Sequence, residues 1–179
     1  VDSSTTGYLL QDKGYEVVGV TAKVFDCEDQ DSKSCCRPKD IEDARLVCSQ
    51  LNIPHIVLDL RQQFKKEVID RFCQQYLEGK TPNPCVDCNR FLRFQHLRQF
   101  AFKLGSAKLA TGHYVRLLKN GQKVAVYRAV DKSKDQSYLF WVANQDILQD
   151  YLTPLGELTK KEVRLLAANL KLSVATKQD

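Results

Sequence analysis

The residues best suited to chemistry are two cysteines, Cys85 and Cys88, in the stretch TPNPCVDCNRFLRF at residues 81–94. Two prolines flank Asn83 and hold the backbone there in an extended or turned conformation. Apolar residues then recur at helical spacing as far as Leu104. The two thiols are therefore expected at the start of a helix, where unpaired amides and the helix dipole favour the reactive thiolate. This placement indicates sulfur chemistry.

The Cys-x-x-Cys spacing by itself leaves several chemistries open. A structural zinc site needs a second pair of ligands, and Cys35 and Cys36 are adjacent, which is a poor geometry for one tetrahedral ion. A thioredoxin-like dithiol opens a helix after a first strand, not after a Pro-Asn-Pro turn deep in the chain. A nucleophilic or sulfur-carrying cysteine remains, as does a partial ligand set for an iron–sulfur cluster. Cys48 and Cys73 lie on apolar helix faces and are expected to be packed core thiols.

The start of the chain offers a second candidate site. Asp2, Ser3 and Ser4 begin a predicted helix, and the free amides and hydroxyls of such a start suit a phosphate group. The same residue types are also the usual helix caps, so the motif alone does not decide between the two roles.

Further polar residues follow the predicted strands. Ligands of open parallel sheets bind beyond the carboxyl ends of the strands, and Gly112 and His113 directly follow one of them. Lys134, Asp135 and Gln136 combine a cation, an acceptor and an amide, which suits contacts with a nucleic-acid backbone and bases. A structural histidine and a polar turn before a helix are the alternative interpretations.

The elements that must position these residues alternate along the first part of the chain. Gly14 ends the first predicted helix, and Pro38 begins the second. Buried strands read as nearly continuous apolar runs, as in YEVVGVTAKVF and HIVLDL. The order predicts an α/β fold with a parallel twisted sheet and helices on both faces. The predicted helices cover residues 4–13, 38–51, 64–77 and about 91–104, and the predicted strands cover residues 15–25, 55–60 and 107–111.

The rhythm changes after residue 113. Segments 114–118 and 124–128 flank Asn120 and Gly121, and Asn-Gly between two alternating segments is a strong β-hairpin signal. A capped helix is expected over residues 159–172. We therefore predict a single domain with a core over about residues 1–113, followed by a hairpin and a small helical region over about 114–179.

Composition narrows the class of protein. The 179 residues are 43% hydrophobic and 27% charged, which is ordinary for a globular domain, and no apolar run is long enough to span a membrane. Seven cysteines, an odd number, favour a reducing compartment, so we expect a cytoplasmic protein. Residues 1–90 carry 12 Lys and Arg against 15 Asp and Glu, whereas residues 91–179 carry 15 against 7. The basic second half permits a polyanionic partner, although a solvated face has the same composition.

Seven short motifs in order resemble one family, the MnmA-type tRNA-specific 2-thiouridylases of the PP-loop ATP pyrophosphatase superfamily. VDSS at the start resembles the tail of the SGGVDSS phosphate loop of that family. The motifs are VDSS at 1–4, GVTAK at 19–23, CC at 35–36 with DAR at 43–45, TPNPC at 81–85 with CN at 88–89, ATGHY at 110–114, KDQSY at 134–138, and PLGE at 154–157 with EVR at 162–164.

The resemblance implies an ATP-dependent reaction with Mg²⁺ on a tRNA that has a wobble uridine. The 2-carbonyl oxygen is adenylated, pyrophosphate leaves, and sulfur from a donor or relay protein replaces the activated oxygen through a cysteine. Carried over by position, Cys88 is the nucleophile. The remaining implied contacts are Asp2, Ser3, Ser4, Ala22 and Gly112 with ATP; Asn83, Pro84 and Cys85 with the target base; and His113, Lys134, Asp135 and Gln136 with tRNA.

Departures from the family pattern define further expectations. The SGG half of the phosphate loop, the second family cysteine and the later β-rich domains are absent, so we expect a truncated N-terminal catalytic domain. Cys85 stands where other members carry Asp. With the downstream cysteine, Cys85 and Cys88 would supply three thiolates, enough for a [4Fe–4S] cluster with one open iron. A cysteine persulfide without metal is the rival hypothesis, and zinc is the third.

Two other functions stay open at this point. A different PP-loop ATP pyrophosphatase, acting on a small molecule, shares the fold but has no need of the Pro-Asn-Pro-Cys loop. A non-catalytic, zinc-dependent RNA-binding module is the alternative from another class. The resemblance implies a bacterial cytoplasmic protein, or an organellar one if the source is eukaryotic, with no membrane partner.

Overall fold

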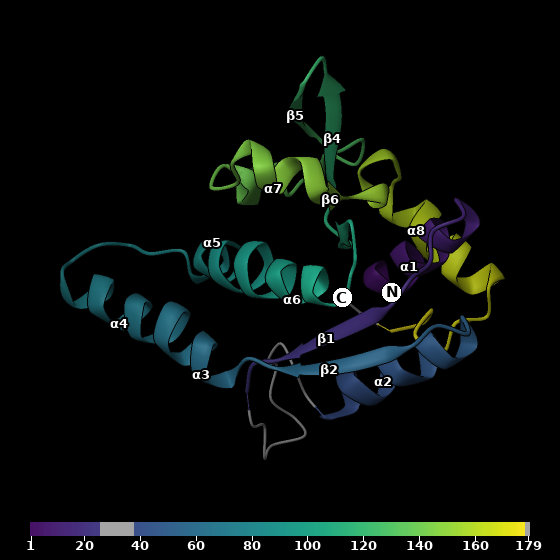
Figure 1. The fold of residues 1–179 in the computed structure, drawn as a ribbon, viewed down its shortest axis with the longest axis horizontal. Coiled ribbons are helices and arrows are strands. Elements are labelled where there is room, and N and C mark those ends of the chain that lie inside the picture. Colours follow the sequence, from purple (N-terminus) through teal and green to yellow (C-terminus); the bar gives the residue numbers. More distant parts are fainter. Residues whose placement is uncertain (26–37, 178–179) are drawn as a thin grey trace.

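Two parallel strands form the centre of the N-terminal half. The computed structural model describes residues 1–25 and 38–177 (Figure 1). Strand β1 (Gly19–Lys23) pairs with β2 (His55–Asp59) in a register that runs from Gly19 opposite His55 to Lys23 opposite Asp59. The connection between them includes helix α2 (Pro38–Gln50), as expected for a parallel crossover.

Helices cover both faces of this ladder. Helix α2 lies on one face and α1 (Asp2–Asp12) on the other, and the helices that follow β2 begin at the end of that strand (Figure 1). A buried cluster of Val24, Leu60, Val68 and Leu92 joins the strand ends to these later helices. The apolar strand runs are therefore buried as their composition predicts.

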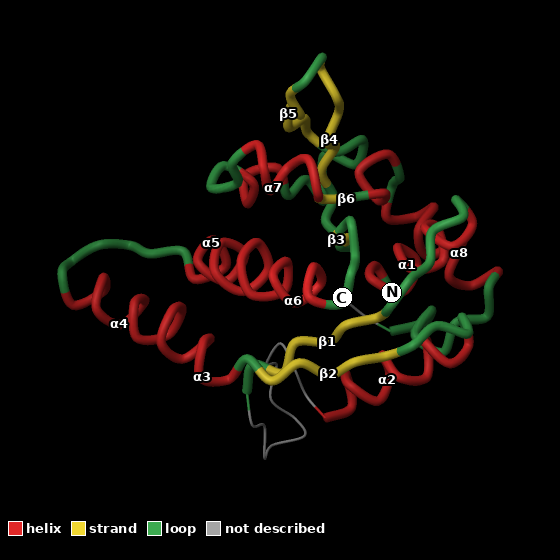
Figure 2. The backbone as a smooth tube through the Cα atoms, viewed as in Figure 1, coloured by secondary structure: helices red, strands yellow, loops and turns green. Residues whose placement is uncertain are grey.

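Two long helices with a π-helical middle section carry the chain from β2 to the end of the cysteine motif. The first consists of α3 (Arg61–Phe64), η1 (Lys65–Ile69) and α4 (Asp70–Leu77), and the second of α5 (Pro84–Asp87), η2 (Cys88–Leu97) and α6 (Arg98–Lys103). Figure 2 shows the loop that links α4 to α5 as an arch between them. π-Helical segments are rare in proteins, and those that occur within α-helices often lie at functional sites.

The two long helices that contain the π segments pack against each other through polar and apolar contacts. His96 Nε2 lies 2.9 Å from Glu67 Oε2, and Arg71 Nε lies 3.7 Å from Asp87 Oδ2. Val68 of η1 and Leu92 of η2 belong to the same buried cluster. The cysteine-bearing helix is thereby fixed to the helix that follows β2.

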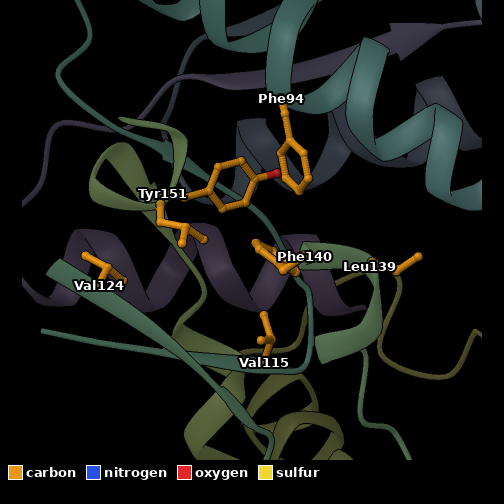
Figure 3. Close-up of a cluster of buried hydrophobic side chains, with 7 residues drawn as sticks. Phe94, Val115, Val124, Leu139, Phe140 and Tyr151 are labelled. Atoms are coloured by element: carbon orange, nitrogen blue, oxygen red, sulfur yellow. The ribbon is translucent and has the colours of Figure 1, made fainter. Parts of the chain in front are cut away.

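The second half of the domain has its own buried cluster, centred on aromatic rings. Phe94 from η2 packs against Phe140 and Tyr151, with ring centroids 5.2 and 5.3 Å apart (Figure 3). Burial raises the pKa of Tyr151 to about 12. The elements around this cluster are β4 (Val115–Asn120), β5 (Lys123–Arg128), η3 (Ser137–Phe140), α7 (Gln145–Asp150) and β6 (Tyr151–Leu152).

Helix η2 contributes to both clusters at once. Leu92 is buried in the cluster at the strand ends, with Val24, Leu60 and Val68, and Phe94 is buried in the aromatic cluster. Each side chain is only 2% exposed. Because the two residues are two positions apart, they point to nearly opposite sides of the helix, which is held between the two cores.

The last elements close the structure against the first helix. Segment η4 (Pro154–Glu157) packs on β4, and α8 (Lys160–Asn169) packs on α1. Thr159 caps α8 in a reciprocal arrangement with Glu162, whose pKa is lowered by the hydrogen bonds from the backbone amide and hydroxyl of Thr159. Residues 114–177 are therefore packed onto the N-terminal half.

Most elements match the sequence prediction, and the α/β class is confirmed. The helices over residues 4–13 and 38–51 and the Asn-Gly hairpin are confirmed within a few residues. The third predicted strand is wrong in its pairing: β3 is only Leu109–Ala110, and it pairs with β6 in a separate parallel ladder rather than with β1 or β2. Within the described residues, no helix is long and apolar enough to cross a membrane.

The free cysteines also test the sequence prediction. Cys48 is buried in α2, as expected, and burial raises its pKa. Cys73 is exposed, so its assignment to the core is wrong, because its side of α4 faces solvent. Cys27, Cys35 and Cys36 lie outside the described residues.

We predict that Gly156→Ala destabilises the domain. A Cβ atom at Gly156 would lie 2.0 Å from the carbonyl oxygen of Val115, so η4 and β4 would have to separate. Overpacking of this kind costs about 1–3 kcal/mol or more, which urea unfolding measures. Gly7→Ala is the control, because its nearest neighbour is 3.5 Å away and alanine favours a helix. Equal stability of the two variants would contradict the assigned contact.

Candidate functional site

A pocket of about 430 Å³ brings together residues from five separate segments of the chain. The segments are the start of α1, helix η2, the turn after β3, the loop before η3 and the start of α8. Three cationic side chains and one carboxylate are among the lining residues, so the pocket is suited to an anion. The lining residues are Asp2, Ser3, Arg93, Gly112, His113, Tyr114, Lys134, Gln136 and Lys160.

Asp2 is held by two residues from distant parts of the chain. Both of its carboxylate oxygens lie 2.8 Å from Lys160 Nζ, and Tyr114 Oη donates to Oδ1 at 2.9 Å. The Lys160 side chain is 11% exposed, and that of Asp2 is 32% exposed. This ion pair joins the first turn of α1 to the first turn of α8, and it compensates the one carboxylate of the pocket lining.

Gly112 lies directly against the start of α1. A Cβ atom at this position would come within 2.9 Å of the Asp2 carbonyl carbon, the Asp2 Cβ and the Ser3 amide nitrogen. Only glycine permits so close an approach of the turn after β3 to the helix. The glycine therefore brings the residues that follow it, His113 and Tyr114, to the edge of the pocket.

His113 is buried although it lines the pocket. Its side chain is 6% exposed, Nδ1 lies 2.8 Å from Thr111 Oγ1, and its ring packs edge-on against Phe140. Burial, with a smaller contribution from the charge of Arg93, lowers the pKa of His113 to about 3. The imidazole is therefore neutral at physiological pH and offers hydrogen bonds rather than charge.

The Lys134–Gln136 segment divides into one exposed and two anchored residues. Lys134 is exposed at the pocket. Asp135 accepts hydrogen bonds from the Ala129 amide and the Ser137 hydroxyl, both at 2.8 Å, and it does not line the pocket. Gln136 exchanges two hydrogen bonds with the backbone of Tyr114, at 2.9 and 3.0 Å. Asp135 and Gln136 thus fix the loop that presents Lys134.

The cysteine motif opens a helix, as its sequence predicts. Asn83 caps α5 by accepting a hydrogen bond from the Cys85 amide at 3.0 Å, and Pro84 occupies the first turn. Asn89 donates to the Cys85 carbonyl at 2.9 Å. The Cys85 side chain is exposed, whereas Cys88 is half-buried against the cluster at the strand ends.

Several predicted site residues do not line the pocket. Asn83, Pro84, Cys85 and Cys88 lie at the start of α5 and η2, and their helix reaches the pocket through Arg93. Ser4 is in the first turn of α1, and Ala22 is in the middle of β1, opposite Leu58. The structure therefore brings some of the predicted phosphate and tRNA contacts together in the pocket, whereas Cys85 and Cys88 lie outside its lining.

A second hollow of about 480 Å³ follows the end of β2 and contains none of the predicted residues. The Asp59 carboxylate in it accepts hydrogen bonds from the Arg61 side chain at 2.9 and 3.1 Å. These bonds, with one from the Arg61 amide, lower the pKa of Asp59 to about 2. The carboxylate of this hollow is already paired with Arg61, and the hollow contains none of the predicted site residues, so it is a weaker candidate site.

Arg93, Tyr114 and Lys160 are the pocket residues that the sequence did not reveal. Arg93 stands between two buried apolar residues, Leu92 and Phe94, and a cation in that position is a signal that can be read from the pattern. Lys160 directly follows the cap of α8 and resembles an ordinary surface lysine in the sequence. Its importance depends on Asp2, which is 158 positions away.

The α/β core and the anion-suited pocket at the start of α1 define a Rossmann-like domain of the PP-loop class. Residues 1–179 match the model of the family described as tRNA methyl transferase HUP domain. The chain belongs to this family.

Relatives with curated names refine the assignment to the MnmA type. The tRNA-specific 2-thiouridylase MnmA of Leptospira interrogans serogroup Icterohaemorrhagiae serovar copenhageni (strain Fiocruz L1-130) is 45% identical over 183 residues, which cover 100% of this chain and 49% of the relative. The protein of the same name from Brucella ovis (strain ATCC 25840 / 63/290 / NCTC 10512) is 48% identical over 182 residues, which cover 100% and 46%. The chain spans about half the length of the curated relatives it matches.

We predict that His113 makes stability depend on pH. Its folded pKa lies below the usual 6.5, so the unfolded chain takes up a proton first as the pH falls, and the free energy of unfolding decreases from about pH 6.5 towards pH 3. Between pH 7 and pH 5 the unmodified chain should lose about 2 kcal/mol more than His113→Gln, measured by urea unfolding. His55→Gln, at a less buried site, is the control. Parallel pH curves for the chain and His113→Gln would contradict the neutral imidazole.

We predict that Lys160→Met lowers stability by roughly 1–3 kcal/mol, because it leaves the Asp2 carboxylate without its cation. A double-mutant cycle with Asp2→Asn should give a coupling energy of about 0.5–3 kcal/mol. Lys161→Met, at the exposed neighbouring position, should change stability by less than about 0.5 kcal/mol. Additive effects of Lys160→Met and Asp2→Asn would mean that the ion pair does not hold the two helices.

Proposed function

We propose that the full-length protein thiolates the wobble uridine of tRNA in an ATP-dependent reaction. The observation that carries this proposal is the shared helix: η2 begins with Cys88 and contributes Arg93 to the anion-suited pocket at the start of α1. Membership of the MnmA type, whose relatives are named tRNA-specific 2-thiouridylases, supports this choice of substrate. A nucleotide and a sulfur nucleophile are the two components that such a reaction needs.

The first step is adenylation of the base. The uridine 2-carbonyl oxygen attacks the α-phosphorus of ATP, a new oxygen–phosphorus bond forms, and the bond to pyrophosphate breaks. Mg²⁺ enters with ATP as part of the substrate. Ser3 and the backbone amides at the start of α1 contact the phosphates. Gly112 contacts the helix start but has no side chain to cover it, and Lys160 holds Asp2 in place.

The second step replaces the activated oxygen by sulfur. The outer sulfur of a Cys88 persulfide attacks C2 of the base, and AMP leaves with the former carbonyl oxygen. A second thiol then attacks the inner sulfur, on Cys88, so the S–S bond breaks, a disulfide forms, and the outer sulfur stays on C2. The carbonyl oxygen of uridine is a poor leaving group before adenylation, which is why the two steps must follow this order. A donor or relay protein supplies the sulfur. Cys85, exposed one helical turn before Cys88, is the second thiol within reach of the same base.

A persulfide needs fewer thiols than a metal cluster does. Within residues 1–25 and 38–177, no group of three or more His, Cys, Asp or Glu side chains is arranged to hold a metal ion. Cys85 and Cys88 supply two thiolates, and a [4Fe–4S] cluster in the full-length protein would need a further cysteine. We route the sulfur through a cysteine persulfide and assign no step to a cluster or to zinc; iron and acid-labile sulfide in the purified full-length protein would favour the cluster instead.

The tRNA contacts follow from the same arrangement. Asn83, Pro84 and Cys85 form the rigid helix start that receives the flipped base. Lys134 contacts the RNA backbone, and Asp135 and Gln136 position it. His113, neutral and buried, contacts RNA through hydrogen bonds only. The basic second half of the chain attracts the polyanion.

Pyrophosphate release tests the proposal directly. Full-length protein is incubated with ATP labelled in the α-phosphate and with unmodified tRNA that carries a wobble uridine. Release of pyrophosphate that depends on this tRNA, with transient label on the RNA, is the expected result. Release stimulated by a small molecule instead supports another PP-loop pyrophosphatase. RNA binding without pyrophosphate release, combined with stoichiometric zinc, supports the binding module.

We predict that Cys88→Ser separates the two steps. The variant should retain tRNA-dependent pyrophosphate release within about threefold and lose at least about a hundredfold in thiouridine formation, because only the second step uses the thiol. Cys73→Ser is the matched control, since this exposed cysteine on α4 lies outside the pocket and should leave both steps unchanged. Thiouridine formed by Cys88→Ser at the unmodified rate would remove Cys88 from the mechanism.

A further inference from the structure

Arg93 has no counter-ion among the residues that the structure describes. Lys160, which also lines the pocket, is paired with Asp2, but no described residue gives the Arg93 side chain a hydrogen bond or an ion pair. The arginine is partly buried, since Leu92 and Phe94 beside it are fully buried in two different clusters. A partly buried cation without compensation is costly, so this position is suited to an anion from outside the chain.

Five other arginines among the described residues are paired with carboxylates within the fold. These pairs lie mostly on the surface. The pairs are Arg45 with Glu42, Arg61 with Asp59, Arg71 with Asp87, Arg98 with Asp150, and Arg116 with Glu157. The fold thus supplies carboxylates readily elsewhere, and Arg93 differs from these arginines in both its partner and its location.

The groups near Arg93 are neutral or already paired. Its charge acts on His113 and Tyr151, lowering the pKa of each, while burial is the larger influence on both. His113 stays uncharged at physiological pH, and the carboxylate of Asp2 is engaged by Lys160 and Tyr114. The guanidinium therefore adds its full charge to the pocket instead of being cancelled there.

We propose that Arg93 is a phosphate-binding residue that couples the nucleotide pocket to the cysteine-bearing helix. The planar guanidinium offers paired N–H donors that match phosphate oxygens. Because Cys88 and Arg93 lie in the same π-helical segment, a phosphate bound by Arg93 is held in a fixed position relative to Cys88. This inference rests on the proposed function, in which two phosphate sources reach the pocket, the polyphosphate of ATP and the backbone of tRNA.

The test compares full-length Arg93→Gln, Arg93→Lys and Arg90→Gln with the unmodified protein. Arg90 is the matched control because it is exposed on the same helix, three positions away, and outside the pocket lining. Two dissociation constants are measured separately: for a non-hydrolysable ATP analogue with Mg²⁺ and no RNA, and for unmodified tRNA without nucleotide over a range of salt. Thermal unfolding checks that each variant folds, and Arg93→Lys retains the charge if Arg93→Gln does not fold.

We expect Arg93→Gln to weaken one of the two ligands by roughly ten- to hundredfold, with Arg93→Lys in between and Arg90→Gln unchanged. Loss of the analogue assigns the contact to the nucleotide. Loss of tRNA, with the salt slope of binding reduced by about one, assigns it to the RNA backbone. Unchanged affinity for both ligands in folded Arg93 variants overturns the inference.

The two proposals fail in different ways. If the unmodified protein binds both ligands and releases pyrophosphate while the Arg93 variants match it, only the role of Arg93 is lost. If the unmodified protein releases no pyrophosphate with tRNA, the proposed function is lost. In that case inorganic pyrophosphate serves as the probe for Arg93, and equal binding by the unmodified protein and Arg93→Gln overturns the phosphate contact as well.

Discussion

The pocket depends on the ion pair between Asp2 and Lys160, because it fixes the one helix start around which all other pocket residues are arranged. Lys160 and Tyr114, from two later parts of the chain, both donate hydrogen bonds to the Asp2 carboxylate. Gly112 lets the turn after β3 contact the same helix start without a side chain between them. Lys160, Tyr114 and Gly112 all contact the first turn of α1, so a small change in the direction of α1 would disturb all three contacts.

Charge in the pocket is set by which groups are compensated and which are not. The fold keeps His113 neutral by burial and pairs Asp2 internally, so neither adds a negative or a titrating group at physiological pH. Arg93, for which the described residues supply no carboxylate partner, leaves the pocket with a positive charge that favours an anion. Such a site discriminates by charge and shape and not by protonation, which suits a substrate that brings several phosphates.

Local features of the fold could be read from the sequence, whereas features that depend on distant pairing could not. The Asn83 cap, the cysteines at a helix start and the Asn-Gly hairpin are set by neighbouring residues and were predictable. Strand β6 has only two residues, and its existence depends on pairing with β3, about forty positions earlier. Cys73 and Tyr76 repeat at helical spacing, but the apolar pattern does not show that their side of α4 faces solvent. Lys160 was missed for the same reason, because its role depends on Asp2, which is distant in the sequence, whereas Arg93 carried a local signal in its position between two buried apolar residues.

The helix between the two cores explains how one fold can hold a nucleophile and a phosphate site in fixed relation. Leu92 packs η2 into the core at the strand ends, and Phe94 packs it into the aromatic core. Rotation of the helix would therefore disrupt the packing of at least one of these two cores. Val86 and Cys88 repeat the same division earlier in the helix: Val86, two turns before Phe94, packs against the aromatic core, and Cys88, one turn before Leu92, packs against the core at the strand ends. Because both ends of this segment are packed on two sides, the orientation of Cys88 is determined by the same contacts that direct Arg93 to the pocket. Precise placement of the sulfur therefore follows from apolar packing, and the polar pocket can be adapted to its ligand without moving the nucleophile.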